Sequence, residues 1–233
     1  MGTPTSEAAR IARVYAERER TIPAGRYSLT EPGTLFIEQE RERVLLDELG
    51  RHDALPLAKQ QILDVGCGAG AWLRNLIRWG ADPARLSGVD LLPERIAAAR
   101  ALLPAAVTLE RGDGARLPFS DARFDLVLQS TVFSSILDAG VRQKVAREML
   151  RVLAPAGLIV WYDARVDSPH NTSFAGISRR ELAALFPGCR MRLRAVTLAP
   201  PLVRRLAPRS WAACRLIGAL PFLRTHWLGL IRR

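Results

Sequence analysis

Glycines and carboxylates that could hold a nucleotide-like ligand gather near the middle of the chain. The segment DVGCGAG (64–70) follows a short apolar run. Glycines after a buried strand allow a tight turn, and the next helix presents free N–H groups and a positive dipole end to an anionic group. The loop alone is ambiguous, because Gly66-x-Gly68-x-x-Ala71 also satisfies the dinucleotide fingerprint. A glycine turn used only for packing is a third interpretation.

Two carboxylates and an amide follow the next apolar segments. Asp90 stands 20 residues after Gly70, where a ribose would lie, and it can accept hydrogen bonds from both ribose hydroxyls. Asp113 follows a third segment and could accept from an adenine amino group, although a turn carboxylate is the alternative. Gln129 ends a fourth segment and is expected to face the same crevice.

The elements that position these residues alternate between two hydrophobic periods. Apolar runs predict strands at 61–66, 86–91, 106–113, 124–130 and 157–163, and helical spacing predicts helices at 3–20, 34–49, 71–79, 93–103, 141–153 and 178–186. Late strands are expected at 191–199 and 225–233, separated by a helical piece at 210–220. Strands alternating with helices indicate a parallel sheet covered on both faces.

Five motifs in order resemble the class I S-adenosylmethionine-dependent methyltransferase superfamily, especially its UbiE-like, methyltransferase domain 11 branch. They are ILDVGCGAG, GVDLLPERI, GDGARLPF, FDLVLQS and EMLRVLAPAGLIV, within residues 61–163. Each piece is common, whereas the ordered set is specific. Pro155-Ala156-Gly157 replaces the usual Pro-Gly-Gly, and Gly114 replaces a frequent alanine. Neither departure removes a cofactor-holding side chain.

The resemblance implies an α/β, Rossmann-like fold. Its seven-stranded sheet would be mostly parallel, with helices on both faces and a reversed C-terminal strand. We expect a helical cap or lid over residues 1–50 and the methyltransferase domain over 51–233, with 190–233 as a basic C-terminal hairpin region.

The implied cofactor is S-adenosyl-L-methionine, released as S-adenosyl-L-homocysteine. The residues implied to surround it are Asp64, Gly66, Cys67, Gly68, Gly70, Asp90, Leu91, Asp113, Gly114 and Gln129. The first five would surround the methionine portion and the ribose. The next two would hold the ribose and flank the adenine. Asp113 and Gly114 would hold the adenine edge, with Gln129 near the methionine end.

Methyl transfer is an in-line displacement that needs a general base only when the acceptor must lose a proton. Acceptor-side residues are expected beyond the fourth and fifth strands and on the N-terminal segment: Tyr15, Tyr27, Thr131, Phe133, Ser134, Tyr162 and Asn171. His170 is the candidate base, because imidazole titrates near neutral pH; an exposed loop histidine is the alternative. Simple packing is the alternative for the two N-terminal tyrosines. The spacing of Cys67, Cys189 and Cys214 predicts no metal site.

The charge is uneven along the chain. Its net value is +11, and the segment from Arg190 to Arg233 holds ten arginines and no carboxylate. Such a segment fits peripheral contact with an anionic membrane or lipid-linked substrate, or a solvated surface. Nucleic acid is disfavoured, because no recognisable RNA-binding module accompanies the arginines. Scattered cysteines, with no apolar leader and no membrane-length apolar run, favour a cytoplasmic protein.

These observations together predict methyl transfer to a small-molecule acceptor, more readily at oxygen than at nitrogen or carbon. The resemblance suggests polysaccharide, sugar or secondary-metabolite biosynthesis. An RNA or protein methyltransferase that docks through the basic C-terminus is one alternative. A non-catalytic cofactor-binding protein is another, and a nicotinamide oxidoreductase fits the later motifs poorly. The sequence does not predict the oligomeric state.

Overall fold

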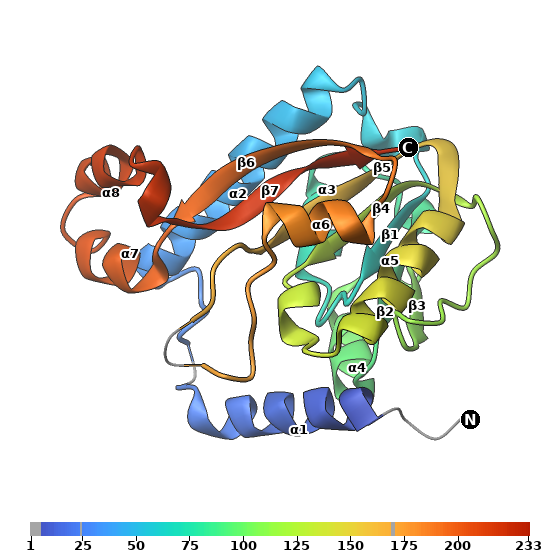
Figure 1. Ribbon diagram of the computed structural model, residues 1–233, viewed down its shortest axis with the longest axis horizontal. Coiled ribbons are helices and arrows are strands. Elements are labelled where there is room, and N and C mark those ends of the chain that lie inside the picture. The colour runs from blue at the N-terminus through green and yellow to red at the C-terminus, as the bar shows by residue number, and fades with distance from the viewer. Residues whose placement is uncertain (1–5, 24, 169–170) are drawn as a thin grey trace.

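Seven strands pair into one sheet with the order β3-β2-β1-β4-β5-β7-β6 (Figure 1). The computed structural model describes residues 6–23, 25–168 and 171–233. The strands are β1 (Ile62–Val65), β2 (Leu86–Asp90), β3 (Thr108–Arg111), β4 (Phe124–Ser130), β5 (Leu153–Ala164), β6 (Arg190–Leu198) and β7 (Arg224–Arg232). Strands β1 to β5 are mutually parallel, and β7 runs antiparallel to both β5 and β6. The expected mostly parallel sheet with one reversed strand is therefore confirmed.

Helices cover both faces of this sheet. They are α1 (Ser6–Thr21), α2 (Pro32–Arg51), α3 (Ala71–Arg78), α4 (Pro93–Leu102), α5 (Ala139–Val152), α6 (Arg179–Leu185), α7 (Pro200–Leu206) and α8 (Trp211–Gly218). Local chemistry fixes several of their starts. Asp138 accepts the Val141 N–H before α5, and Ser178 accepts the Glu181 N–H before α6. No helix within the described residues is long and apolar enough to cross a bilayer.

Side-chain alternation along the strands produces two core layers. On one face, Leu128 and Val160 pack with α2, α3 and α4, whereas on the other Val127 and Trp161 pack with α5 and α6. Both faces are apolar because each is covered by helices. The crevice at the carboxyl ends of the strands is therefore held by a rigid, dry scaffold.

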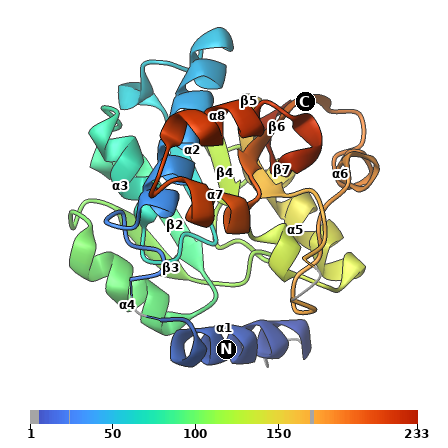
Figure 2. The ribbon, with the colours of Figure 1, turned by 90° about the vertical axis from the view of Figure 1, so that its left-hand side faces the viewer.

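The two N-terminal helices pack differently. Val44, Leu45 and Leu49 of α2 are buried in the core layer beside β1. Helix α1 instead lies across the carboxyl ends of the strands, at the bottom of Figures 1 and 2. Among the described residues before position 51, only α1 therefore has the position of a lid.

The connection between β6 and β7 carries two short helices. We call residues 199–223, with α7 and α8, the α7–α8 lobe. It projects at one end of the molecule and faces the viewer in Figure 2. Helix α7 lies outside the helices predicted from the sequence; Pro200 stands in its first turn, where a backbone N–H would have no acceptor within the helix.

Candidate functional site

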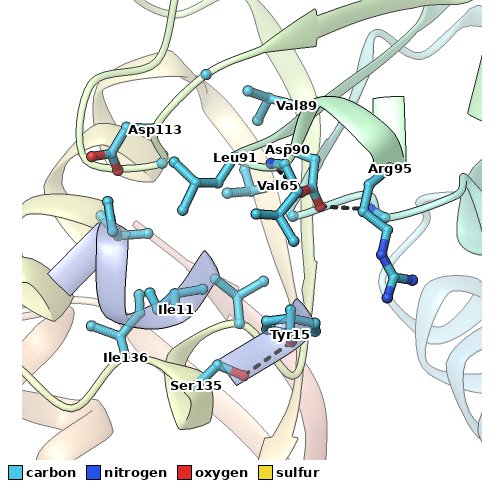
Figure 3. A pocket seen from close by; sticks show the side chains of 18 of the residues that line it. Ile11, Tyr15, Val65, Val89, Asp90, Leu91, Arg95, Asp113, Ser135 and Ile136 are labelled. Carbon is cyan, nitrogen blue, oxygen red and sulfur yellow. Dashed lines mark hydrogen bonds between the residues drawn. The ribbon is translucent and has the colours of Figure 1, made fainter. Parts of the chain in front are cut away.

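A pocket of about 190 Å³ lies beneath α1 at the carboxyl ends of β1, β2 and β4. Its floor is formed by Val65, Gly66 and Gly68, and its side by Asp90 and the loop after β3. In Figure 3, Ile11 and Tyr15 of α1 face this floor from the opposite side. Open α/β sheets bind ligands at this position, because loops there can vary without disturbing the core.

The glycine loop is held in a conformation that side chains disfavour. Gly66, Gly68 and Gly70 have φ angles of 72°, 53° and 77°. The N–H groups of Gly66 and Cys67 both donate to the Val89 carbonyl, at 2.8 and 3.0 Å, which ties the loop to β2. A Cβ on Gly66 would lie 2.5 Å from Cγ2 of Val132. Glycine is therefore required here for both φ and space.

Asp90 orders the same loop from the end of β2. Its Oδ2 accepts the Gly68 N–H at 2.8 Å, and its Oδ1 accepts the Leu92 N–H at 3.0 Å. Burial nevertheless raises the pKa of Asp90, since desolvation outweighs these two hydrogen bonds. Each carboxylate oxygen keeps a second lone pair that could accept from a ribose hydroxyl.

Asp64, expected beside the cofactor, is a buried carboxyl behind the pocket and lies outside its lining. It is 1% exposed at the end of β1, and neither of its carboxylate oxygens has a hydrogen-bond partner among the described residues. Desolvation, reinforced by the Asp90 charge, raises the pKa of Asp64 to about 8. A buried carboxyl without a partner is costly in the free protein. Because Asp64 lies outside the pocket lining, the glycine loop and Asp90 are the groups of this region that a cofactor would contact.

The Asp64 proton makes a testable contribution to stability. The folded state keeps a proton up to a pKa of about 8, whereas the unfolded chain releases it near the ordinary value of 3.8, so the free energy of unfolding falls as pH rises between these values. Asp64→Asn should remove this decline. Between about pH 6.5 and pH 8, urea unfolding of the free protein should show wild type losing roughly 1–2 kcal/mol more than the variant. Equal losses would contradict the raised pKa. Glu110→Gln, an exposed carboxyl on β3, is the matched control.

The loop after β3 supplies the other end of the pocket. Asp113 Oδ1 accepts the Ala115 N–H at 2.9 Å, which leaves its second oxygen free for an adenine amino group. Leu91 and Gly114 line the pocket nearby. A Cβ on Gly114 would meet Val65 and Val145 at 3.4 and 3.5 Å, which is ordinary contact. An alanine at this position would therefore fit.

The sequence and fold of this chain are similar to those of known methyltransferases. A family model described as a methyltransferase domain matches residues 62–157. Malonyl-(acyl-carrier protein) O-methyltransferase from Erwinia billingiae is 34% identical over 116 residues, covering 50% of this chain and 43% of that protein. Residues 62–157 of this chain therefore match a methyltransferase domain. The cofactor of this domain is S-adenosyl-L-methionine, and S-adenosyl-L-homocysteine is its product.

Other relatives of the methyltransferase domain differ in the atom they methylate. Norajmaline N-methyltransferase from Rauvolfia serpentina is 33% identical over 106 residues, covering 43% of this chain and 35% of that protein. The chain thus spans less than half the length of either curated relative. The YcgJ protein from Bacillus subtilis shares the fold, with a TM-score of 0.60 at 16% identity, covering 84% of this chain and 99% of that one. The methyltransferase domain by itself therefore does not identify the acceptor molecule.

Several residues expected at the cofactor lie just behind the pocket of the methyltransferase domain. Cys67 is 6% exposed, and burial raises the pKa of its thiol above the ordinary range. Gly70 ends the loop, where a Cβ would lie 2.5 Å from Leu103 Cδ1. Gln129 is fully buried; its Oε1 accepts the Val132 N–H at 3.1 Å. These three residues shape the loops that form the wall, while Gly66, Gly68, Asp90, Leu91, Asp113 and Gly114 line it.

Of the residues expected on the acceptor side, some line the pocket and others lie away from it. Tyr15 and Thr131 line the pocket. Tyr27 is 59% exposed in the loop after α1. The Asn171 side chain accepts the Ser173 N–H in a turn. His170 lies outside the described residues.

Three residues expected in the acceptor pocket instead lie in the core. Phe133 and Ser134 are fully buried in a short turn after β4, and Phe133 packs on Trp161 with ring centroids 4.7 Å apart. Tyr162 lies on the α2 face of β5, where its hydroxyl is 2.9 Å from Thr197 Oγ1. Burial of β5 on both faces explains the position of Tyr162, because neither face of this strand is free to line a cleft.

Contacts across the pocket fasten α1 in place. Glu7 Oε1 accepts the Leu137 N–H at 2.6 Å, and Arg10 donates to the Ser135 carbonyl at 2.5 Å. The Glu7–Arg10 ion pair measures 2.8 Å and holds the pKa of Glu7 at about 2. Farther along, Tyr15 Oη lies 3.2 Å from Ser135 Oγ. The sequence offered only the i, i+3 spacing of Glu7 and Arg10, which does not reveal a partner more than 120 residues away.

Loss of the Glu7 contacts should loosen the lid. In Glu7→Ala, the Leu137 N–H loses its acceptor and Arg10 loses its ion-pair partner. We expect amide hydrogen exchange to rise roughly tenfold in α1 and at residues 135–138, which corresponds to about 1.4 kcal/mol of local stability. Glu17→Ala, an exposed site on the same helix, should leave exchange unchanged. Equal protection in both variants would show that α1 is held by other contacts.

Proposed function

We propose that this protein transfers the methyl group of S-adenosylmethionine to a small-molecule acceptor, at an oxygen atom. The observation that carries the proposal is the placement of α1 across the pocket, fastened by Glu7 and Arg10 to the segment after β4. A pocket covered by a helix admits a small molecule, whereas a folded RNA or protein surface would first have to displace that helix.

The pocket wall combines apolar and hydroxyl groups on the acceptor side. Ile11, Ile136 and Val141 supply an apolar surface, and Tyr15 and Ser135 supply hydroxyls. Apolar side chains exclude water, while hydroxyls can orient a polar acceptor by donating or accepting a hydrogen bond. Alignment of the acceptor with the activated methyl group in a dry site would supply much of the rate.

Proton removal depends on the acceptor. Glu7, the pocket carboxylate nearest to the lid contacts, is a weak base because its pairing with Arg10 holds its pKa at about 2. An acceptor oxygen that is already ionised at neutral pH, such as a carboxylate, needs no base. For a hydroxyl acceptor, we propose His170 as the base. His170→Ala should then slow transfer to hydroxyls and leave transfer to carboxylates unchanged, which a pH–rate profile on each acceptor would reveal.

A transfer assay tests the function directly. The purified chain would be incubated with S-adenosylmethionine labelled in the methyl group and with separate sets of carboxylate, phenol, sugar and amine acceptors, alongside RNA and protein substrates. We expect labelled product only with small molecules, and first with oxygen acceptors. Label on RNA or protein would replace the proposal with a macromolecular methyltransferase. Cofactor binding without turnover on any acceptor would indicate a non-catalytic binding protein.

A further inference from the structure

The α7–α8 lobe carries the two most exposed large apolar side chains of the described residues. Leu216 on α8 is 76% exposed, and Phe222, in the turn before β7, is 74% exposed. Leu220 lies between them and is 44% exposed. Single exposed apolar residues are common on soluble proteins, but three within seven residues form a cluster that calls for a partner.

The fold itself does not require this cluster. The inner side of α8 already packs through Cys214 and Gly218, which are buried, and through Trp211, whose ring meets Phe36 edge-on at 5.5 Å. These inner positions recur at helical spacing, and Leu216 lies outside them. The buried side of α8 therefore builds the lobe, while Leu216 leaves an apolar side chain on the side that faces solvent.

Exposed cations lie on the same lobe. Arg205, Arg209 and Arg215 are exposed, and no carboxylate of the described residues forms an ion pair with them. Other arginines of the basic segment are engaged internally. Arg194 pairs with Asp47 at 2.9 Å, and Arg224 donates to the Gly218 and Ala195 carbonyls. Within the lobe, Arg209 donates to the Arg205 carbonyl at 2.9 Å, and the charges of Arg205, Arg209 and Arg215 are not neutralised by a carboxylate of the described residues.

We propose that the α7–α8 lobe docks on an anionic lipid bilayer. Arg205, Arg209 and Arg215 would contact the headgroups, while Leu216, Leu220 and Phe222 would enter the boundary with the acyl chains. Stable peripheral attachment needs two weak signals together, and the lobe supplies both basic and apolar groups. A nucleic acid would satisfy the arginines but would leave the aliphatic side chains in water.

Vesicle co-sedimentation of the full chain tests this docking. The probes are phosphatidylcholine vesicles with and without about 30% phosphatidylglycerol, a fraction that gives a negative surface potential. One variant replaces Leu216 and Phe222 by Ser, and a second replaces Arg205, Arg209 and Arg215 by Gln. Leu102→Ser with Val166→Ser is the apolar control, because both residues are exposed outside the lobe. Arg147→Gln, Arg179→Gln and Arg180→Gln together remove the same charge from α5 and α6.

We expect binding to the anionic vesicles that weakens as salt rises, with little binding to the neutral ones. Each arginine near the surface is worth about a fivefold change in partitioning, so the triple Gln variant should bind on the order of a hundredfold more weakly. The Ser variant should fall by a similar factor, and both controls should bind like wild type. Circular dichroism would verify that every variant is folded.

Each of the following results would overturn the proposal. The lobe variants could bind the anionic vesicles as tightly as wild type does. Wild type could also bind neutral and anionic vesicles equally, or bind neither kind of vesicle. The lobe could instead mediate contact with another macromolecule, shown by retention of RNA without vesicle binding or by self-association that the Ser variant abolishes. The assay needs no cofactor or acceptor, so its outcome is independent of methyl transfer.

Discussion

Asp90→Ala is expected to weaken binding of S-adenosylhomocysteine by roughly 100-fold or more. A hydrogen bond to a charged group is worth about 1.5–3 kcal/mol, and a ribose could donate two of them to this carboxylate. The variant also loses the acceptor for the Gly68 N–H, which lies 2.8 Å from Asp90 Oδ2 and orders the loop. Isothermal titration calorimetry at matched pH and salt would measure the change.

The matched control for this variant is Glu94→Ala. Glu94 is an exposed carboxylate in the first turn of α4 that lies outside the pocket lining. The Glu94→Ala substitution removes one charge close to Asp90 without removing a hydrogen bond to the glycine loop. Its affinity should stay within a few-fold of wild type. If Asp90→Ala bound the cofactor product as tightly as Glu94→Ala, the ribose assignment would be wrong.

Gly66→Ala is expected to lower the free energy of unfolding by roughly 2–5 kcal/mol and to abolish measurable cofactor binding. The left-handed φ of 72° costs a non-glycine residue about 1–2 kcal/mol. The added Cβ would also lie 2.5 Å from Val132 Cγ2, and overpacking of this kind costs about 1–3 kcal/mol. Any shift of the loop would disturb the pocket floor, which Gly66 lines. Urea unfolding and calorimetry would measure the two effects.

Gly188→Ala separates strain from crowding. Gly188 has a φ of 74°, but a Cβ there would meet nothing within 4 Å, and the residue lies outside the pocket lining. This variant should lose only the strain contribution and keep cofactor affinity. Equal destabilisation of the two variants would mean that Val132 moves freely and that Gly66 serves only its backbone conformation.

The sheet was predictable from the sequence because strand and helix periods alternate cleanly from Ile62 to Ala164. The boundaries were less so. A helix was expected to end at residue 153 and a strand to begin at residue 157, whereas β5 already begins at Leu153. Leu153 pairs with Phe124, and the register then shifts before Leu126 pairs with Leu158. Helix α7 was missed since prolines mark both turns and first helical turns, and only the surrounding packing distinguishes them.

The cofactor side of the pocket was predictable to the extent that it depends on local backbone. Gly66, Gly68 and Asp90 are fixed by the turn between a strand and a helix, which short motifs encode. The acceptor side depends on contacts between distant segments. Tyr162 reads as a pocket residue at the end of β5, but the packing of α2 and β6 turns it into a core residue. Glu7 belongs to the site because it contacts Leu137, and no local sequence pattern predicts this contact.

The central claim is that this pocket holds S-adenosylmethionine, and a paired calorimetric titration tests it most directly. The purified protein would be titrated with S-adenosylhomocysteine and, separately, with NADH, the ligand of the dinucleotide fingerprint that the glycine loop also satisfies. We predict one site for S-adenosylhomocysteine, with a dissociation constant on the order of micromolar, and no detectable heat with NADH. Tight binding of NADH without binding of S-adenosylhomocysteine would contradict the account.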